Sequence, residues 1–200
     1  MTQDASVPLV PSPGQTVGPF FGYALPFPDD HLLVPRSHPR AVRLAGRVLD
    51  GHGDPVPDAL LELWQADEQG RVSREQGSLR RDGYTFTGWG RASTDRAGHY
   101  GFTTLRPGAD PGRAPFFAVT VFARGLLNRL FTRAYLPDDG DLLTGDPLLA
   151  SLPPERRRTL VAQADEHGYR FDVVLQGDRE TVFLRFPRHP DPPGSATISA

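Results

Sequence analysis

The 200-residue sequence contains no cysteine, which excludes disulfide bonds, thiolate metal sites and a cysteine nucleophile. It also lacks an excess of one charge, because 22 basic residues stand against 24 acidic ones. We therefore expect neither nucleic acid nor a membrane as partner. No apolar run approaches the roughly 20 residues that a membrane helix needs. The N-terminus has no basic segment followed by an apolar run, so we expect no secretory signal and a cytoplasmic protein.

Glycine and proline are abundant, with 21 residues of each. They form neither a repeat nor one low-complexity block, but are scattered between short apolar runs. Short apolar runs separated by glycine and proline are typical of an all-β protein with many turns. A chain of this length fits one domain with arms.

Alternating apolar residues predict a series of strands. Over 42–49 the residues Val42, Leu44, Gly46 and Val48 fall on one face. The 126–136 segment fits either a strand or a helix, and its Thr132 and Tyr135 favour a strand. The other predicted strands are Ala59–Gln65, His99–Thr104, Phe116–Arg124 and a hairpin of Phe171–Gln176 with Thr181–Phe186 around Gly177.

The remaining segments predict one helix and two arms. Pro153–Asp165 is expected to be helical, with proline in its first turn and Gly168 beyond its end. The stretch TVGPFFGYALPF (16–27) is aromatic but broken by prolines and glycines, which favours an extended arm. We predict a β-sandwich of about seven or eight strands, with an N-terminal arm at 1–40, the sandwich at 41–187 and a flexible C-terminal tail at 188–200.

Several segments, taken in their order along the chain, indicate a protein family as well as a fold class. They include PSPGQTVGPFF (11–21), GRVLDGHGDPVPDALLELWQADEQGR (46–71), GWGRASTDRAGHYGFTTLRPG (88–108) and APFFAVTVFARGLLNRLFTRAYLPDD (114–139). This ordered set resembles the intradiol ring-cleaving dioxygenases over about residues 11–187, and the ELWQA and FARGL…TRAY pieces are its most specific parts. The resemblance implies a β-sandwich with a transthyretin-like core.

The resemblance also implies a ferric cofactor, held in catalytic chains by two tyrosinates and by two histidines spaced as H-x-H. In this sequence the tyrosine positions fall on Val72 and, in a loosely aligned loop, on Asp110. The H-x-H pair falls on Phe116 and Ala118. All four ligands are replaced, and we expect the apolar replacements to pack as core. Arg113, where catalytic chains carry an arginine beside the iron, is expected to be a relic.

The two-subunit members of the family cleave protocatechuate with O₂, and the resemblance places this chain among their non-catalytic subunits. It implies a homologous beta subunit that holds Fe(III), a pocket between the two chains and a larger hetero-oligomer. Carried over by motif, the substrate-binding residues are Thr16, Gly18 and Pro19 of the arm, and Arg133 of the FTRAY segment. An arginine suits a substrate that bears a carboxylate. The competing interpretations are a simple turn that docks the arm on its own domain, and a surface or strand-edge arginine.

Two other functions compete with this one. A self-sufficient catechol or hydroxyquinol dioxygenase needs the four ligands within one chain. Tyr84 and Tyr135 are candidate metal-binding phenols, but no two of the six histidines have H-x-H spacing. A non-enzymatic sandwich module that binds a ligand or a protein is compatible with the fold alone. The QTVGPFF arm distinguishes the dioxygenase subunit from such a module, because a generic module has no need of that segment.

Overall fold

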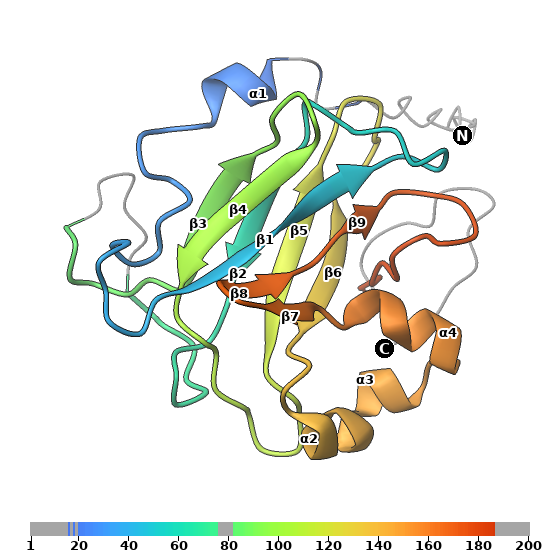
Figure 1. The fold of residues 1–200 in the computed structure, drawn as a ribbon. Helices are drawn as coiled ribbons and strands as arrows, with labels where there is room; N and C mark the ends of the chain where they lie inside the picture. The colour runs from blue at the N-terminus through green and yellow to red at the C-terminus, as the bar shows by residue number, and fades with distance from the viewer. Residues whose placement is uncertain (1–15, 17, 19, 76–81, 187–200) are drawn as a thin grey trace, which may run out of the picture.

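Residues 16, 18, 20–75 and 82–186 are described in a computed structural model of the chain, and they form two β-sheets with a shared core (Figure 1). One sheet has the order β4-β1-β8-β7, and β9 pairs with β1 beyond this path. Its strands are β1 (Val42–Leu49), β4 (His99–Thr104), β7 (Gln163–Asp165), β8 (Gly168–Arg170) and β9 (Val173–Val174). The other sheet, β3-β2-β5-β6, contains β2 (Leu60–Trp64), β3 (Trp89–Ser93), β5 (Phe116–Phe122) and β6 (Leu130–Tyr135).

The core lies between the two sheets and follows the predicted alternation. Leu44 and Val48 of β1 are fully buried, and Leu61 and Leu63 of β2 meet them from the opposite sheet in one cluster. Phe117 of β5 fills the same layer. Removing these side chains from water is the main favourable term in folding. The prediction of a β-sandwich is confirmed.

Strand β1 joins neighbours of both directions. It runs antiparallel to β4, with Val42 opposite Thr104, and parallel to β8, with Arg43 opposite Gly168. Beyond β8 it continues parallel to β9. Gly46 lies where the two parallel partners meet, and a Cβ there would collide with the backbone carbonyl of Phe171. The strand therefore requires glycine at this position.

The late helix is much shorter than predicted. Helix α4 spans Pro154–Arg157, a 3₁₀ turn follows over Arg158–Leu160, and the last predicted helical residues form β7 instead. The cause is tertiary pairing: Val161 forms a bridge with Tyr135, and the Ala162 amide donates to the Tyr135 carbonyl at 2.9 Å. This hydrogen bond carries the chain out of helical geometry and along β6.

The predicted hairpin over 171–186 is also wrong as a strand pair. Its first half contains β9, which pairs with β1. Its second half lies beside β6, where the Leu184 amide donates to the Phe131 carbonyl at 2.7 Å. Thr181 connects the halves, since its hydroxyl accepts from the Val174 amide and its own amide donates to the Val174 carbonyl. Strands β3 and β8 were not predicted because they are short and contain glycine, and β7 was not predicted because its residues were assigned to the helix.

Three further short helices have no counterpart in the sequence prediction. They are α1 (Phe21–Ala24), α2 (Gly140–Gly145) and α3 (Pro147–Ala150). Helix α1 lies within the 16–27 segment that was expected to be an extended arm, so that expectation is wrong for these four residues. In the described part of the chain, no helix is both long and apolar enough to cross a membrane.

Candidate functional site

The two positions that the resemblance matches to histidine ligands lie on the outer face of the β3-β2-β5-β6 sheet. Phe116 and Ala118 project from β5 and stand opposite Tyr135 and Arg133 of β6. Both are only half-buried, so the expectation that they fill the interior core is wrong. The ring of Phe116 instead packs against a second, smaller cluster that contains Tyr135 and helix α3.

The two positions that the resemblance matches to tyrosine ligands, Val72 and Asp110, lie in loops. Val72 is 75% exposed, which contradicts its expected role as core. Its backbone forms a bridge with Ala66, and this pairing directs the side chain to solvent. Asp110 is exposed as well. The geometry of the loops decides that both side chains are exposed. The apolar character of a single valine does not reveal that geometry.

These four positions do not fit a ferric ion. Val72, Phe116 and Ala118 have no ligating atom, and Asp110 offers one carboxylate without a partner from the other three. Within the described residues, no three His, Cys, Asp or Glu side chains come together in a way that could hold a metal. A ferric ion needs several anionic or imidazole donors converging on one point. The side chains at these four positions therefore do not form a donor set for a ferric ion.

Arg133 occupies the outer face beside these positions. Its guanidinium carbon lies 4.1 Å from the centroid of the Phe116 ring, a cation–π contact. Its Nη1 donates to the Tyr135 hydroxyl at 3.1 Å. Within the described residues the guanidinium makes no other hydrogen bond and no ion pair. Arg133 therefore places a positively charged group with unused N–H donors beside the apolar side chains of Phe116 and Ala118.

Tyr135 connects Arg133 to a buried carboxylate. The tyrosine is fully buried, and its hydroxyl donates to Asp146 Oδ1 at 3.1 Å. Asp146 is 1% exposed and caps helix α3. Its two oxygens also accept from the amides of Leu148 (3.0 Å), Leu149 (3.2 Å) and Ala114 (3.2 Å). Four donors thus converge on one carboxylate, which satisfies its buried charge.

The pKa of Tyr135 is raised to about 12, chiefly by burial, although the hydrogen bond from Arg133 lowers it. Burial disfavours the phenolate, so the hydroxyl keeps its proton at working pH and remains a donor to Asp146. Burial likewise raises the pKa of Tyr169 to about 12, aided by its hydrogen bond to Asp138, and raises that of Tyr100 further.

We predict that native protein at about pH 11 ionises fewer of its five tyrosines than denatured protein does. The three native pKa values lie above the unfolded value of about 10. Their contribution to stability is therefore complete below about pH 10 and is lost as the pH rises toward about 12. Ultraviolet difference absorbance of tyrosinate, with and without denaturant, measures the deficit. Equal ionisation in both states would contradict the buried environments.

The arm residues carried over by motif are only partly described. The Gly18 amide donates to the Thr16 hydroxyl at 3.3 Å, and Gly18 has φ of +73°, a conformation that favours glycine. Thr16 is exposed and Pro19 lies outside the described residues. No described contact joins Thr16 or Gly18 to Arg133. The structure thus shows a tight turn at Thr16 and Gly18 in the arm.

The outer face also carries aromatic residues that the sequence prediction did not single out. Trp64, Ala118 and Arg133 follow one another across β2, β5 and β6 in one register row. Trp64 is 52% exposed, and its neighbour Trp89 stacks on Phe27 from the arm segment. Alternation within LLELW would have placed Trp64 on the outer face. The row forms an apolar platform that ends at Arg133.

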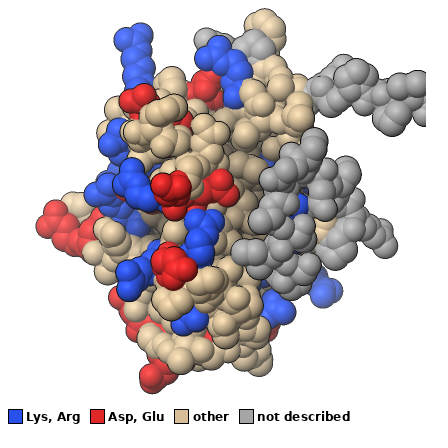
Figure 2. All heavy atoms as spheres, turned by 90° about the vertical axis from the view of Figure 1, so that its right-hand side faces the viewer, with Lys and Arg blue, Asp and Glu red and all other residues tan. Residues whose placement is uncertain are grey.

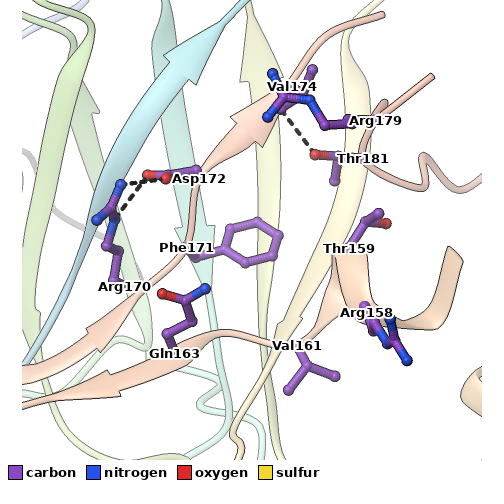
Figure 3. Close-up of a pocket in the computed structure, with 10 residues that line it drawn as sticks. All are labelled: Arg158, Thr159, Val161, Gln163, Arg170, Phe171, Asp172, Val174, Arg179 and Thr181. Carbon is purple, nitrogen blue, oxygen red and sulfur yellow. Dashed lines mark hydrogen bonds and ion pairs between the residues drawn. The ribbon is translucent and has the colours of Figure 1, made fainter. Parts of the chain in front are cut away.

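A separate hollow of about 150 Å³ lies between the 3₁₀ turn, β7 to β9 and the 177–181 turn. Figure 3 shows Arg170 paired there with Asp172, and Thr181 bonded to Val174. On the neighbouring surface, cationic and anionic side chains are interspersed rather than gathered by sign (Figure 2). None of the site residues predicted from sequence lines this hollow.

Comparison with known proteins agrees with this architecture. A family model described as dioxygenase matches residues 17–177, most of the chain. The chain belongs to the intradiol dioxygenase family. Among curated intradiol dioxygenases it is 39% identical over 197 residues to the protocatechuate 3,4-dioxygenase alpha chain of Burkholderia cepacia, covering 88% of this chain and 98% of the relative. The beta chain of the same organism is 34% identical, covering 90% and 85%.

A solved dioxygenase structure shares the fold. The dioxygenase domain of a dioxygenase carbohydrate-binding protein fusion from Streptomyces sp. SirexAA-E superposes with a TM-score of 0.52 and 27% identity. The alignment covers 84% of this chain and 99% of that domain. Sequence reasoning named Tyr135 only as a candidate metal-binding phenol, whereas its hydroxyl bonds to Arg133 and Asp146, and it missed Asp146 altogether. The Asp-Pro pair at 146–147, a signal for a helix start, could have pointed to the cap.

Proposed function

We propose that this chain is the non-catalytic alpha subunit of a protocatechuate 3,4-dioxygenase and that it pairs with a homologous beta subunit. The match over nearly its full length to an alpha chain carries the proposal. The absence of ligating side chains at Val72, Phe116 and Ala118 supports it, because a self-sufficient dioxygenase needs those ligands. The same match disfavours a non-enzymatic binding module.

In this proposal the beta subunit holds the Fe(III), and the active-site pocket lies between the two chains. The complex cleaves protocatechuate with O₂ between its two hydroxyl-bearing carbons and gives 3-carboxy-cis,cis-muconate. The iron supplies the chemistry of ring opening when it is bound in the partner. The higher hetero-oligomer works in the cytoplasm.

This chain would contribute substrate-binding residues to the pocket. Arg133 offers a guanidinium with unused donors, which suits the carboxylate of protocatechuate. The arm, residues 1–40, would bring Thr16, Gly18 and Pro19 to the pocket wall. The sandwich of residues 41–187 would hold Arg133 in place, and the tail at 188–200 has no assigned role.

The deciding experiment measures iron content and protocatechuate-dependent oxygen uptake. The chain is purified alone and after co-expression with a homologous chain that carries the Tyr/Tyr/His/His set. We expect iron and activity only in the co-purified complex, because the ligand positions of this chain offer no donors. Stoichiometric iron in the lone chain would overturn the proposal. The failure of the two chains to associate would favour the binding module.

A further inference from the structure

Three side chains form a continuous hydrogen-bonded path from the N-terminus of α3 to the outer face of the sheet. Asp146 lies at the buried end, Tyr135 in the middle and Arg133 at the half-buried end. The first step, from the Tyr135 hydroxyl to Asp146, is 3.1 Å, and so is the step from Arg133 to that hydroxyl.

The chemistry of these groups allows one arrangement. Arginine only donates, an ionised carboxylate only accepts, and the hydroxyl between them does both. Tyr135 therefore gives its proton to Asp146 and presents its lone pair to Arg133. The three backbone amides on Asp146 fix the carboxylate in turn. The hydroxyl oxygen is thus held at one place and in one orientation.

An arginine side chain has much rotamer freedom and needs contacts to remain in one orientation. Arg133 has two such contacts, the Tyr135 hydroxyl and the face of the Phe116 ring. Its remaining N–H groups have no acceptor among the described residues. They form an unused, oriented fork, the geometry that binds a carboxylate in bidentate fashion.

We propose that Tyr135, backed by Asp146, is a positioning residue that orients the Arg133 guanidinium toward the carboxylate of the substrate. This inference rests on the proposed function, because it requires that Arg133 face the substrate in the assembled enzyme. It extends that function to two buried residues that do not touch substrate. The substrate class it selects is a catechol that bears an acidic group.

The chain contains a matched control for the effect of losing a buried tyrosine hydroxyl. Tyr169 is buried, its hydroxyl donates to Asp138 at 2.9 Å, and its pKa is raised to about 12, as for Tyr135. Among the described residues its hydroxyl has no bond to Arg133. Tyr169→Phe therefore removes the same atom and the same type of bond without touching the path to Arg133.

The experiment compares Tyr135→Phe with Tyr169→Phe in the co-purified complex. We expect Tyr135→Phe to raise the KM for protocatechuate about fivefold to tenfold, because the guanidinium loses one of its two fixed contacts. Tyr169→Phe should leave KM unchanged. Iron content should stay the same in both variants. Inhibition by catechol, which lacks the carboxylate, should keep its wild-type constant in Tyr135→Phe.

A second variant tests the other contact without disturbing the buried pair. Phe116→Leu removes the ring beneath the guanidinium and should also raise the KM for protocatechuate while the inhibition by catechol holds. If Tyr135→Phe does not assemble, Phe116→Leu still tests whether the fixed orientation of Arg133 governs the KM for protocatechuate, and an unchanged KM in this variant would reject the positioning mechanism.

The outcomes separate the inference from the function on which it rests. Unchanged KM in Arg133→Ala would reject Arg133 as a substrate contact, whatever the tyrosine variants do. A raised KM in Arg133→Ala, with KM in Tyr135→Phe equal to that in Tyr169→Phe, would reject the positioning role alone. Weaker binding of catechol as well as protocatechuate in Tyr135→Phe would show a general disturbance of the pocket and would also reject it.

Discussion

Arg133→Ala in the assembled enzyme is expected to raise the KM for protocatechuate by about 10-fold to 100-fold. A hydrogen-bonded contact between a guanidinium and a carboxylate contributes about 1.5–3 kcal/mol, and truncation removes all of it. The iron content should not change, because none of its ligands comes from this residue in our proposal. Steady-state oxygen uptake and metal analysis of the same preparation measure both quantities.

Arg129→Ala is the matched control for this substitution. Arg129 also lies over an aromatic ring, with its guanidinium carbon 4.9 Å from the centroid of Phe131, but it is exposed and has no link to Tyr135. We expect wild-type KM in this variant. If Arg133→Ala and Arg129→Ala behave alike, or if the iron is lost together with the arginine, Arg133 is not a carboxylate contact.

Asp146→Ala is expected to destabilise the chain by about 3–5 kcal/mol, because it leaves several buried donors without their shared acceptor. The carboxylate satisfies the Tyr135 hydroxyl and three backbone amides, all at buried positions. Its removal leaves these donors unpaired in a region with little access to water. The same change removes the cap of α3.

Thermal unfolding of the purified complex and of the lone chain measures this loss. For a chain of this size, 3–5 kcal/mol corresponds to a fall in Tm of about 6–20 °C. Asp141→Ala provides the control, because Asp141 is an exposed acid in the first turn of α2 and should cost less than about 1 kcal/mol. A loss below about 1 kcal/mol in Asp146→Ala would show that water or neighbouring groups replace the carboxylate.

The alternation of apolar residues predicted the sheets well where strands are long and one face is buried. Strand β1 has the predicted bounds and the predicted inward face. The prediction failed where long-range pairing decides the conformation. The residues of β7 have good helical periodicity, but pairing with β8 imposes an extended backbone on them, and the preceding Ala162 bonds to β6.

The candidate site could be located from the sequence but not completed. The motifs fixed the strand positions of Phe116, Ala118 and Arg133, and β-pairing placed Arg133 beside them. The contribution of Asp146 required the structure, because it depends on where the loop after β6 returns. The prediction that Val72 is a core residue was wrong because a short loop has no alternation of apolar and polar residues from which the direction of a side chain can be read.

The parallel pairing of β1 sets the order in which this sheet can form. The partners Arg47 and Asp172 stand 125 residues apart in the chain. At a synthesis rate of about 5–20 residues per second, β8 and β9 are made about 6–25 s after β1. During that interval one edge of the strand has unpaired amides and carbonyls. Slow folding and transient aggregation are the expected consequences of such long-range pairing. Expression at low temperature or with chaperones should therefore improve the yield of this chain more than that of a sandwich whose central strands pair locally.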